Sequence, residues 1–399
     1  MSLKSKIMKK KNETIQRPIS LQPGESASVV SPIYPSVVYA SETPDMLDDQ
    51  YEGRVQGYTY AREGHPNATA LAKQIDLLEQ TDGGIITGSG MAAITAAIMG
   101  TLSSGDHIVG GDQLYGRSLR LMKSDLPRFG IEVSLTDVTD ISKVKGAIKS
   151  NTKLILVELV SNPTLRVADI SGIVSLCREK DIKLLVDNTF TTPKAFKPMS
   201  AGADIVVNSI TKLLAGHSDV TLGYVVAKDK KLNKSIYDFV VTTGLTPSPY
   251  ECWLAERGLM TFPLRFDSSQ ATALGLANYL AVNENVDRVI YPTLPDHPDA
   301  AHVKQNLGSN GCNIVSFELK NKTREAANRF VKQLDGIAFA PTLGDVGTTL
   351  SHPASSSHRG LSEDERLTLG ITEGFFRVSV GLEDISSLTE KFELALKHT

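Results

Sequence analysis

The stretch from Ile182 to Gly223 combines two short apolar runs with polar side chains of the types used in catalysis. The runs IKLLVD and ADIVV have the length and β-branched content typical of buried parallel strands. Asp187 ends the first run, and Ser209, Thr211 and Lys212 closely follow the second. Because ligands bind at the carboxyl ends of strands in open α/β sheets, we expect these side chains to share one crevice.

The chemistry of this set suits pyridoxal phosphate. A lysine amine such as Lys212 can form a Schiff base with the aldehyde of that cofactor. A carboxylate such as Asp187 can keep the pyridine nitrogen protonated, so that the ring accepts electrons. Ser209 and Thr211 are placed to donate hydrogen bonds to the phosphate. Taken singly, Asp187 is explained by the capping of a turn and Lys212 by an exposed position on the surface. The combination of the two at two strand ends favours the cofactor.

A glycine-containing motif leaves an alternative open. Gly88-Ser-Gly-Met-Ala-Ala precedes a run of small and apolar residues that predicts a helix, and the first N–H groups of a helix bind anions. The same letters fit the dinucleotide fingerprint G-x-G-x-x-A, with Asp106 and Asp112 near the position of its acidic residue. A nicotinamide-dependent oxidoreductase is therefore the rival class, although it leaves Asp187 and Lys212 without a role.

The segments VDNTF and GADIVVNSITKLLAGHSDV resemble the cofactor-lysine region of the Cys/Met-metabolism family of pyridoxal-phosphate enzymes. The resemblance extends from about Pro32 to about Asp384. It implies an α/β protein of fold type I, with a mostly parallel sheet in the large domain and a smaller C-terminal α+β domain. It also implies pyridoxal 5'-phosphate as cofactor, Lys212 as the catalytic lysine, and a homo-oligomer in which dimers share active sites within a tetramer.

The resemblance implies further cofactor ligands. YAREGHPN resembles the family motif Y-S-R-x-x-N-P-T, in which the residues at Tyr60 and Arg62 reach the phosphate of a neighbouring subunit's cofactor. His65 and Asn67 replace the usual Asn and Thr of that motif. The other implied ligands are Ser89, Gly90 and Met91 at the phosphate, Tyr115 stacked on the ring, and Asn162 at the 3′ oxygen.

Substrate contacts are implied near the C-terminus. Arg377, in FFRVSVGLED, matches the arginine that holds the α-carboxylate of an amino acid, and Thr342 falls beside it where Ser is usual. Family members that act on cystathionine have Glu at the position of Pro341, which offers no charge. Arg117 stands where methionine γ-lyases have Cys. We expect Arg117 at the cavity wall, favouring an anionic or strongly polar γ-substituent; an exposed helix charge is the alternative.

The resemblance implies a carbon–sulfur lyase, which we expect to act by γ-elimination on an amino acid of the methionine, homocysteine or cystathionine type. Lys212 would remove the α-proton, and Tyr115 would protonate the leaving sulfur or shuttle protons. Replacement at the γ-carbon, in which an activated homoserine ester accepts a thiol, is the alternative because both reactions share their early steps.

The whole chain is consistent with a multidomain enzyme. Its 399 residues exceed one ordinary core, and we expect an N-terminal arm (1–63), a cofactor-binding large domain (64–257) and a small domain (258–399). The last boundary lies in a helical stretch where Glu256 replaces the family's usual Leu. Hydrophobic residues make up 41% and charged residues 22%, which is typical of a soluble enzyme. The net charge of −3, with no basic stripe, argues against nucleic acid binding.

The remaining signals indicate a cytoplasmic protein without metal. The segment MSLKSKIMKKKNETIQ lacks the apolar region of a signal peptide and predicts a disordered arm, and no run reaches the length of a membrane span. The three cysteines form neither a disulfide framework nor a metal pattern. The adjacent residues His217-Ser218-Asp219 cannot face one another as a catalytic triad. The pairs His352/His358 and His297/His302 lack a third metal ligand.

Overall fold

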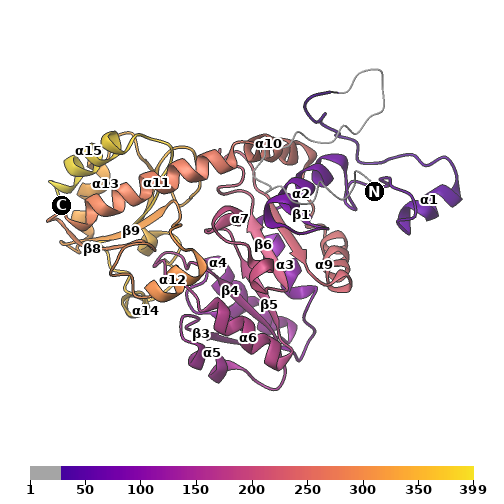
Figure 1. Cartoon of the computed structure of the whole chain (residues 1–399), viewed down its shortest axis with the longest axis horizontal. Helices are drawn as coiled ribbons and strands as arrows, with labels where there is room; N and C mark the ends of the chain where they lie inside the picture. Colours follow the sequence, from indigo (N-terminus) through magenta and orange to yellow (C-terminus); the bar gives the residue numbers. More distant parts are fainter. Residues whose placement is uncertain (1–27) are drawn as a thin grey trace, which may run out of the picture.

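The computed structural model describes residues 28–399 of the chain (Figure 1). The basic segment predicted to be disordered lies outside the described residues, as does the first part of the predicted arm. The described elements form two parts, each built on one β-sheet, and the helix α11 (Phe262–Ala281) runs from one to the other.

The larger sheet has seven strands, and its interior explains the apolar runs in the sequence. In sheet order the strands are β1 (Ile85–Thr87), β7 (Gly223–Ala227), β6 (Ile205–Ser209), β5 (Lys183–Asp187), β4 (Thr152–Glu158), β2 (His107–Gly111) and β3 (Glu132–Thr136). Every neighbouring pair is parallel except the two pairs of β7, which is antiparallel to β1 and β6. The predicted mostly parallel sheet is therefore confirmed.

Helices pack on both faces of this sheet. The helical segments preceding α11 are α1 (Pro44–Tyr51), α2 (Pro66–Glu79), α3 (Gly90–Met99), α4 (Gly116–Arg120), the π-helical turn η2 (Leu121–Asp125), η3 (Leu126–Phe129), α5 (Ile141–Ala147), α6 (Ile170–Lys180), α7 (Thr192–Ala195), α8 (Pro198–Ala201), α9 (Lys230–Thr243) and α10 (Pro249–Leu259). On β5, Leu184 and Val186 pack with Ile173 of α6, whereas Leu185 packs with Ile94 of α3. Successive side chains of a strand point to opposite faces, so a strand covered on both sides must be apolar throughout.

The smaller sheet belongs to an α+β unit. In sheet order its strands are β10 (Ala338–Phe339), β11 (Thr349–Ser351), β12 (Phe375–Ser379), β9 (Ile314–Leu319) and β8 (Val286–Ile290), antiparallel except for β10 and β11. Its helical segments are α12 (Ala300–Asn306), α13 (Arg324–Gln333), η4 (Pro353–Ser355), α14 (Glu363–Thr368) and α15 (Ile385–Leu396). Phe317 lies at its centre, with ring centroids 5.7 to 6.1 Å from those of Phe330, Phe376 and Phe392.

Helix α11 contacts both cores. Phe262 and Phe266 pack in the large part with α10, whereas Ala273 and Leu280 pack with the aromatic cluster of the small part. The division expected at residue 258 falls within α10, and we propose that α11 is the element shared by the two domains. Within residues 28–399, the structure contains no helix that is both long and apolar enough to span a bilayer.

Candidate active site

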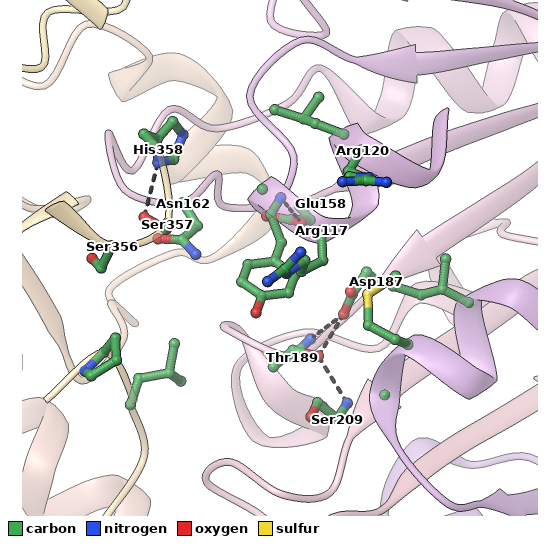
Figure 2. Close-up of a pocket in the computed structure, with 18 of the residues that line it drawn as sticks. Arg117, Arg120, Glu158, Asn162, Asp187, Thr189, Ser209, Ser356, Ser357 and His358 are labelled. Carbon is green, nitrogen blue, oxygen red and sulfur yellow. Dashed lines mark hydrogen bonds between the residues drawn. The ribbon is translucent and has the colours of Figure 1, made fainter. Parts of the chain in front are cut away.

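A cleft of about 950 Å³ lies where the carboxyl ends of β4, β5 and β6 face loops of the small domain (Figure 2). Twelve of the residues predicted from the sequence line it: Ser89, Gly90, Met91, Tyr115, Arg117, Asn162, Asp187, Ser209, Thr211, Lys212, Thr342 and Arg377. The parallel arrangement of the strands explains this convergence, because residues that end neighbouring strands meet at one edge of the sheet.

Two buried carboxyl groups lie side by side in this cleft. Glu158 and Asp187 are register partners at the ends of β4 and β5. Asp187 Oδ1 accepts hydrogen bonds from Thr189 Oγ1 at 2.6 Å and Thr189 N at 3.0 Å, and Glu158 Oε1 accepts one from Tyr115 N at 2.6 Å. Burial raises the pKa of both carboxyl groups, and the charge of Asp187 raises the pKa of Glu158 further. A cationic ligand group placed beside the pair would relieve this repulsion.

Lys212 follows β6 and is partly buried. Burial lowers the pKa of its amine, and the positive charge of Arg377 lowers it further. At a given pH a larger fraction of such an amine is unprotonated, and the unprotonated amine is the form that attacks an aldehyde or accepts a proton. The position therefore suits the reactive lysine that the sequence predicted.

The start of α3 and the end of β6 form a narrow anion cradle. Ser89 Oγ caps α3 by accepting a hydrogen bond from Ala92 N at 3.0 Å, which leaves the Gly90 and Met91 amides in the first turn, where an α-helix has no internal acceptors. A Cβ atom on Gly90 would lie 2.7 Å from Ser209 Cβ and 2.9 Å from Ser209 Oγ. Only glycine lets these segments approach so closely, and the donors that result match a phosphate group.

The Thr211 hydroxyl already has hydrogen-bond partners within the protein, which the sequence did not predict. Its Oγ1 donates to Leu222 O at 3.1 Å and accepts from Leu222 N at 3.0 Å. A hydroxyl group has one proton, so donation to a phosphate requires that Thr211 give up its contact with the Leu222 carbonyl.

A buried guanidinium forms the opposite wall of the cleft. Arg377 Nη1 donates to Asn162 Oδ1 at 2.8 Å, and Nη2 donates to Thr342 O at 2.7 Å, while Nε has no partner among the described residues. Burial lowers the pKa of Arg377 to about 10. A buried arginine with donors to spare is suited to a carboxylate ligand. The contact uses the main-chain oxygen of Thr342, so it does not depend on whether residue 342 is Thr or Ser.

Helix α4 contributes positive charge to the rim of the cleft. Arg117 lines the cleft, and its side chain is exposed, as is that of Arg120 one turn later. A Cβ atom on Gly116 would overlap the Ser357 carbonyl, so α4 packs directly on the small-domain loop. Arg120 was not predicted from the sequence, and neither were the other lining cations, Lys123 and Arg359. The three-residue spacing of the two arginines in α4 was the available signal.

His358, which the sequence suggested only as a potential metal ligand, also lines the cleft. Its Nδ1 lies 2.9 Å from Ser357 Oγ, and burial together with the charge of Arg377 lowers its pKa to about 4. It is therefore a neutral imidazole near neutral pH. Among the described residues, no group of three or more His, Cys, Asp or Glu side chains is arranged to hold a metal ion.

Tyr60 and Arg62 lie away from the cleft of their own chain. The Arg62 guanidinium lies over the Tyr60 ring, 5.4 Å from its centroid, and donates to Val241 O at 3.0 Å. Tyr60 is 38% exposed. Both side chains are thus available at the surface, where the sequence predicted that they act on a neighbouring subunit.

Each of the three departures from the family motifs has a structural role: one caps a helix, and two bind the N-terminal segment. His65 Nδ1 caps α2 by accepting from Ala68 N at 3.2 Å. The fully buried Asn67 accepts from Tyr34 N and donates to Pro32 O, both at 2.9 Å. Glu256, in place of Leu, accepts a hydrogen bond from Ser31 Oγ at 2.8 Å.

Two buried side chains support the cleft from behind. Arg265 of α11 donates to the carbonyls of Leu213 at 2.8 Å and Leu214 at 3.0 Å, directly after Lys212. Glu79 of α2 accepts from Asn208 Nδ2 of β6 at 2.6 Å. Burial raises the pKa of Glu79 to about 7, and both Glu79 Oε2 and Asn208 Oδ1 lack partners among the described residues.

The topology argues against the dinucleotide alternative. That fingerprint requires two neighbouring parallel strands joined by the helix. Here α3 follows β1, but four strands (β7, β6, β5 and β4) separate β1 from β2 in the sheet. Asp112, which follows β2, is therefore remote from the start of α3, and the oxidoreductase alternative is wrong.

Comparisons with known proteins agree with this geometry. A family model described as Cys/Met metabolism PLP-dependent enzyme matches residues 13–397. The chain is 42% identical over 341 residues to a cystathionine beta-lyase of Bacillus subtilis (strain 168), covering 85% of this chain and 86% of that protein. The structure of a cystathionine gamma-lyase from Lactobacillus plantarum complexed with L-serine has a TM-score of 0.89 at 32% identity, covering 96% of this chain and 97% of the other.

A second solved structure bears on the lysine. A putative O-acetylhomoserine (thiol)-lyase from Campylobacter jejuni matches with a TM-score of 0.88 at 28% identity, covering 93% of this chain and 96% of that one. It carries a pyridoxyl-lysine-phosphate residue. These neighbours have fold type I of the pyridoxal-phosphate enzymes, so the predicted fold class is confirmed.

Proposed function

The chain belongs to the Cys/Met metabolism family of pyridoxal-phosphate-dependent enzymes, whose relatives are carbon–sulfur lyases and γ-replacing enzymes, and we propose that it cleaves the γ-carbon–sulfur bond of a sulfur-containing amino acid. The observation that carries this proposal is the cleft itself. It combines a partly buried lysine of lowered pKa, a pair of buried carboxyl groups and a buried arginine with free donor capacity.

The residues of the cleft fit the cofactor. Among the described residues neither Asp187 nor Glu158 forms an ion pair, so the two carboxyl groups would hold a protonated pyridine nitrogen, and the start of α3 with Ser209 would hold the phosphate. Because Asn162 Oδ1 already accepts from Arg377, its amide Nδ2 is the group left to donate to the 3′ oxygen. When bound, the cofactor supplies an electron sink that stabilises negative charge on the α-carbon of the substrate.

The side chains of this chain would supply binding and proton transfer. Arg377 binds the α-carboxylate and orients the α-hydrogen toward Lys212. Lys212 Nζ accepts that proton, a role favoured by the lowering of its pKa through burial and the charge of Arg377, and it moves a second proton at the β-carbon. Tyr115 Oη donates a proton to the leaving sulfur. With water, the products are a thiol, a 2-oxo acid and ammonia.

A substrate panel tests this reaction. Methionine, homocysteine, cystathionine and an O-acylhomoserine are each supplied with and without a thiol acceptor, and all products are identified. The proposal requires oxo-acid release without an acceptor, and 2-oxobutanoate with cysteine from cystathionine. Pyruvate with homocysteine would instead indicate β-elimination, the activity named for the Bacillus subtilis relative.

A γ-replacement reaction is the second candidate, supported by the likeness to the O-acetylhomoserine (thiol)-lyase structure. It predicts that turnover of the homoserine ester depends on the thiol acceptor and yields a thioether without ammonia. Strict dependence on the acceptor across the panel would replace the lyase proposal with this one.

Arg117 would set the preference among γ-substituents. It lines the cleft from α4 and no carboxylate lies within ion-pair distance among the described residues, whereas Pro341 and Leu343 on the facing loop are uncharged. A cation beside the leaving group favours a negatively charged or strongly polar substituent over a methylthio group. We therefore propose a lyase of imperfect specificity for methionine.

The active sites would be shared between subunits. Tyr60 and Arg62 lie at the surface, outside the cleft of their own chain, and the nearby Val37 and Val38 are exposed apolar residues. An arrangement in which they complete a partner's phosphate site accounts for both observations. We propose a dimer of such sites within a tetramer. Mixing Arg62→Ala chains with Lys212→Ala chains should restore activity, and confirmed mixed dimers without activity would refute the sharing.

The cytoplasm is the proposed location. All three cysteines are buried and unpaired, as expected in a reducing compartment where disulfides are not needed. Fractionation of cells that produce the protein would test this, and recovery in an oxidising compartment would contradict it.

A further inference from the structure

The segment that carries Asn162 is a short hairpin between β4 and α6. Val160 forms an isolated antiparallel bridge with Val167, and Ser161 N donates to Arg166 O at 2.9 Å. We call residues 160–167 the Asn162 hairpin. Its tip places Asn162 Oδ1 2.8 Å from Arg377 Nη1, so the hairpin connects the large sheet to the proposed carboxylate anchor.

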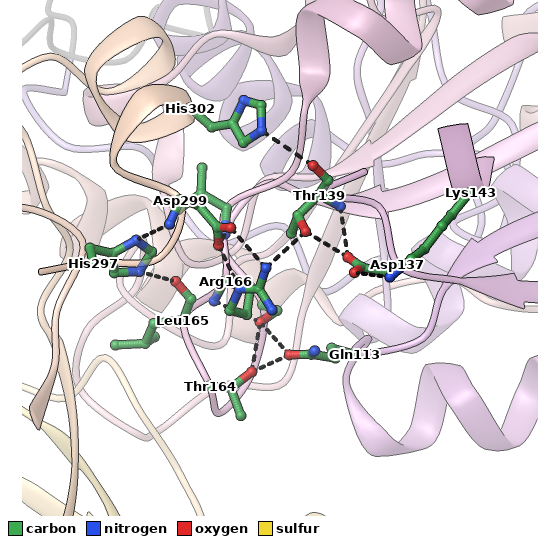
Figure 3. Close-up of polar contacts among 12 residues, drawn as sticks. Gln113, Asp137, Thr139, Lys143, Thr164, Leu165, Arg166, His297, Asp299 and His302 are labelled. Atoms are coloured by element: carbon green, nitrogen blue, oxygen red, sulfur yellow. Dashed lines mark hydrogen bonds and ion pairs between the residues drawn. The ribbon is translucent and has the colours of Figure 1, made fainter. Parts of the chain in front are cut away.

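One carboxylate of the small domain, that of Asp299, binds the base of this hairpin (Figure 3). Asp299, which precedes α12, accepts from Arg166 Nε at 2.7 Å and from Arg166 Nη2 at 2.8 Å on separate oxygens. The same carboxylate accepts from the main-chain N of Val167 at 2.9 Å. Three charge-assisted bonds from one buried carboxylate fix both a side chain and the backbone of the hairpin.

Further contacts extend along the hairpin. Ser316 Oγ donates to Pro163 O at 2.6 Å, and His297 Nε2 lies 3.0 Å from Leu165 O. Leu165 and Val167 are fully buried in a cluster that also contains Val303, Leu307 and Ile314 of the small domain. Successive hairpin residues therefore contact the second half of the chain through side chain, backbone and apolar packing.

Asp299 does not line the cleft. Its effect on a ligand must therefore pass through the hairpin. Arg377 is held by only two protein acceptors, Asn162 Oδ1 and Thr342 O, and its Nε is unpartnered in the described part of the chain. A shift of Asn162 removes one of the two contacts that set the plane of the guanidinium.

We propose that Asp299 is a positioning residue for the carboxylate anchor: its fork with Arg166 and its bond to Val167 N hold the Asn162 hairpin so that Asn162 orients Arg377. The inference rests on the proposed role of Arg377 in binding the substrate's α-carboxylate. It predicts that a side chain outside the cleft controls affinity for the amino acid and not the rate of proton transfer.

The test compares Asp299→Asn with Asp140→Asn. Asp140 caps α5 by accepting a hydrogen bond from Ser142 N at 2.9 Å, and among the described residues it has no hydrogen bond to the Asn162 hairpin or to Thr139. Asparagine caps a helix about as well as aspartate, so the control substitution is conservative. Hydrogen–deuterium exchange of peptides covering 160–168 is measured on the full chain without added cofactor. KM and kcat are measured on the cofactor-saturated enzyme, in wild-type and Asn162→Ala backgrounds.

We expect Asp299→Asn to accelerate exchange in the hairpin and to raise KM about fivefold, the effect of losing one net hydrogen bond, with kcat changed less than twofold. In the Asn162→Ala background the same change should add little to KM, because the two residues act in series. Asp140→Asn should alter neither quantity. If Asp299→Asn fails to fold, Arg166→Lys, which keeps the charge but lacks the fork, must show the same pattern.

Unchanged exchange in the hairpin, or a KM effect that adds in full to that of Asn162→Ala, would overturn the proposal. A fall in melting temperature with KM unchanged would assign the pair a purely structural role. Arg377→Lys separates the anchor role from the positioning role. If it leaves KM unchanged, the anchor role of Arg377 is refuted, whereas an effect in Arg377→Lys without one in Asp299→Asn refutes only the positioning.

Discussion

Replacement of Arg377 tests two proposed roles of this residue at once, namely binding of the substrate's α-carboxylate and the electrostatic effect on Lys212. Arg377→Lys keeps the positive charge but loses the planar fork, and Arg377→Gln removes the charge. In the structure the guanidinium is buried, donates to Asn162 and Thr342, and retains an unpartnered Nε. The same charge is one of the causes that lower the pKa of Lys212. The two variants therefore separate carboxylate binding from the electrostatic effect on the lysine.

The expected magnitude for Arg377→Lys follows from the hydrogen bonds that the substitution removes. Lysine supplies one charge-assisted bond to a carboxylate where the fork supplies two, and such a bond contributes about 1.5–3 kcal/mol. The value of kcat/KM for the amino acid should fall roughly 10- to 150-fold, mostly through KM. Arg377→Gln should lose more, because the charge is also absent. Melting temperatures and cofactor absorbance of each variant show whether the fold and the cofactor site persist.

The electrostatic part is measured on Lys212 directly. In the cofactor-free protein, the rate at which an amine-reactive reagent labels Lys212 is followed against pH by peptide mass spectrometry. Removing the cation raises the pKa of the lysine, so labelling of Arg377→Gln should begin at higher pH than in wild type, whereas Arg377→Lys should not shift. A labelling curve unchanged in Arg377→Gln, or a kcat/KM within threefold of wild type in Arg377→Lys, would refute this reasoning.

Three further substitutions have defined outcomes. Burial raises the pKa of Glu79 to about 7, which means that the folded protein favours the protonated carboxyl group. The stabilisation by the protonated group is therefore full at low pH and is lost as pH rises through about 7. Glu79→Gln should therefore gain about 1–3 kcal/mol over wild type at pH 8 but little at pH 5, as measured by chemical denaturation; a difference independent of pH would contradict this. Gly90→Ala should weaken cofactor binding about tenfold, because its Cβ would lie 2.7 Å from that of Ser209. Gly146→Ala, whose Cβ meets nothing within 4 Å, is the control, and equal titration curves would rule out the cradle. Arg117→Cys should raise kcat/KM for methionine relative to anionic substrates about 10- to 150-fold, whereas an unchanged ratio would make the arginine a surface charge.

The proposed cofactor end of the cleft was predictable because its signals are local. Asp187 and Lys212 stand at the ends of apolar runs, and the strands deliver them to the same edge of the sheet. The turn that starts α3 is likewise encoded in consecutive residues. For such positions the sequence pattern and the three-dimensional position are related by the geometry of a parallel sheet.

Contacts that join distant segments could not be predicted in this way. Arg166 and Asp299 are 133 residues apart, and Glu79 and Asn208 are 129 apart, with no pattern that pairs them. The use of the Thr211 hydroxyl by Leu222 depends on how β7 returns beside β6. The order of strands also decided against the dinucleotide alternative, and strand order depends on the packing of the whole domain.

The departures from the family motif show a related limit. His65 and Asn67 differ from the usual residues, yet each has found a structural partner, one as a helix cap and the other as an anchor for residues 32–34. A single sequence reveals that a residue is unusual but not which neighbour has adapted to it.

The residues behind Lys212 constrain how this enzyme can be recombined with its relatives. Arg265 of α11 binds the carbonyls of Leu213 and Leu214, and a Cβ atom on Gly344 would lie 2.5 Å from Leu213 N. The peptide that follows Lys212, the proposed reactive lysine, is thus enclosed by residues that come later in the chain. A chimaera that joins residues 1–257 to the C-terminal part of another protein would keep its cofactor chemistry only if the donor brought both the arginine and the glycine.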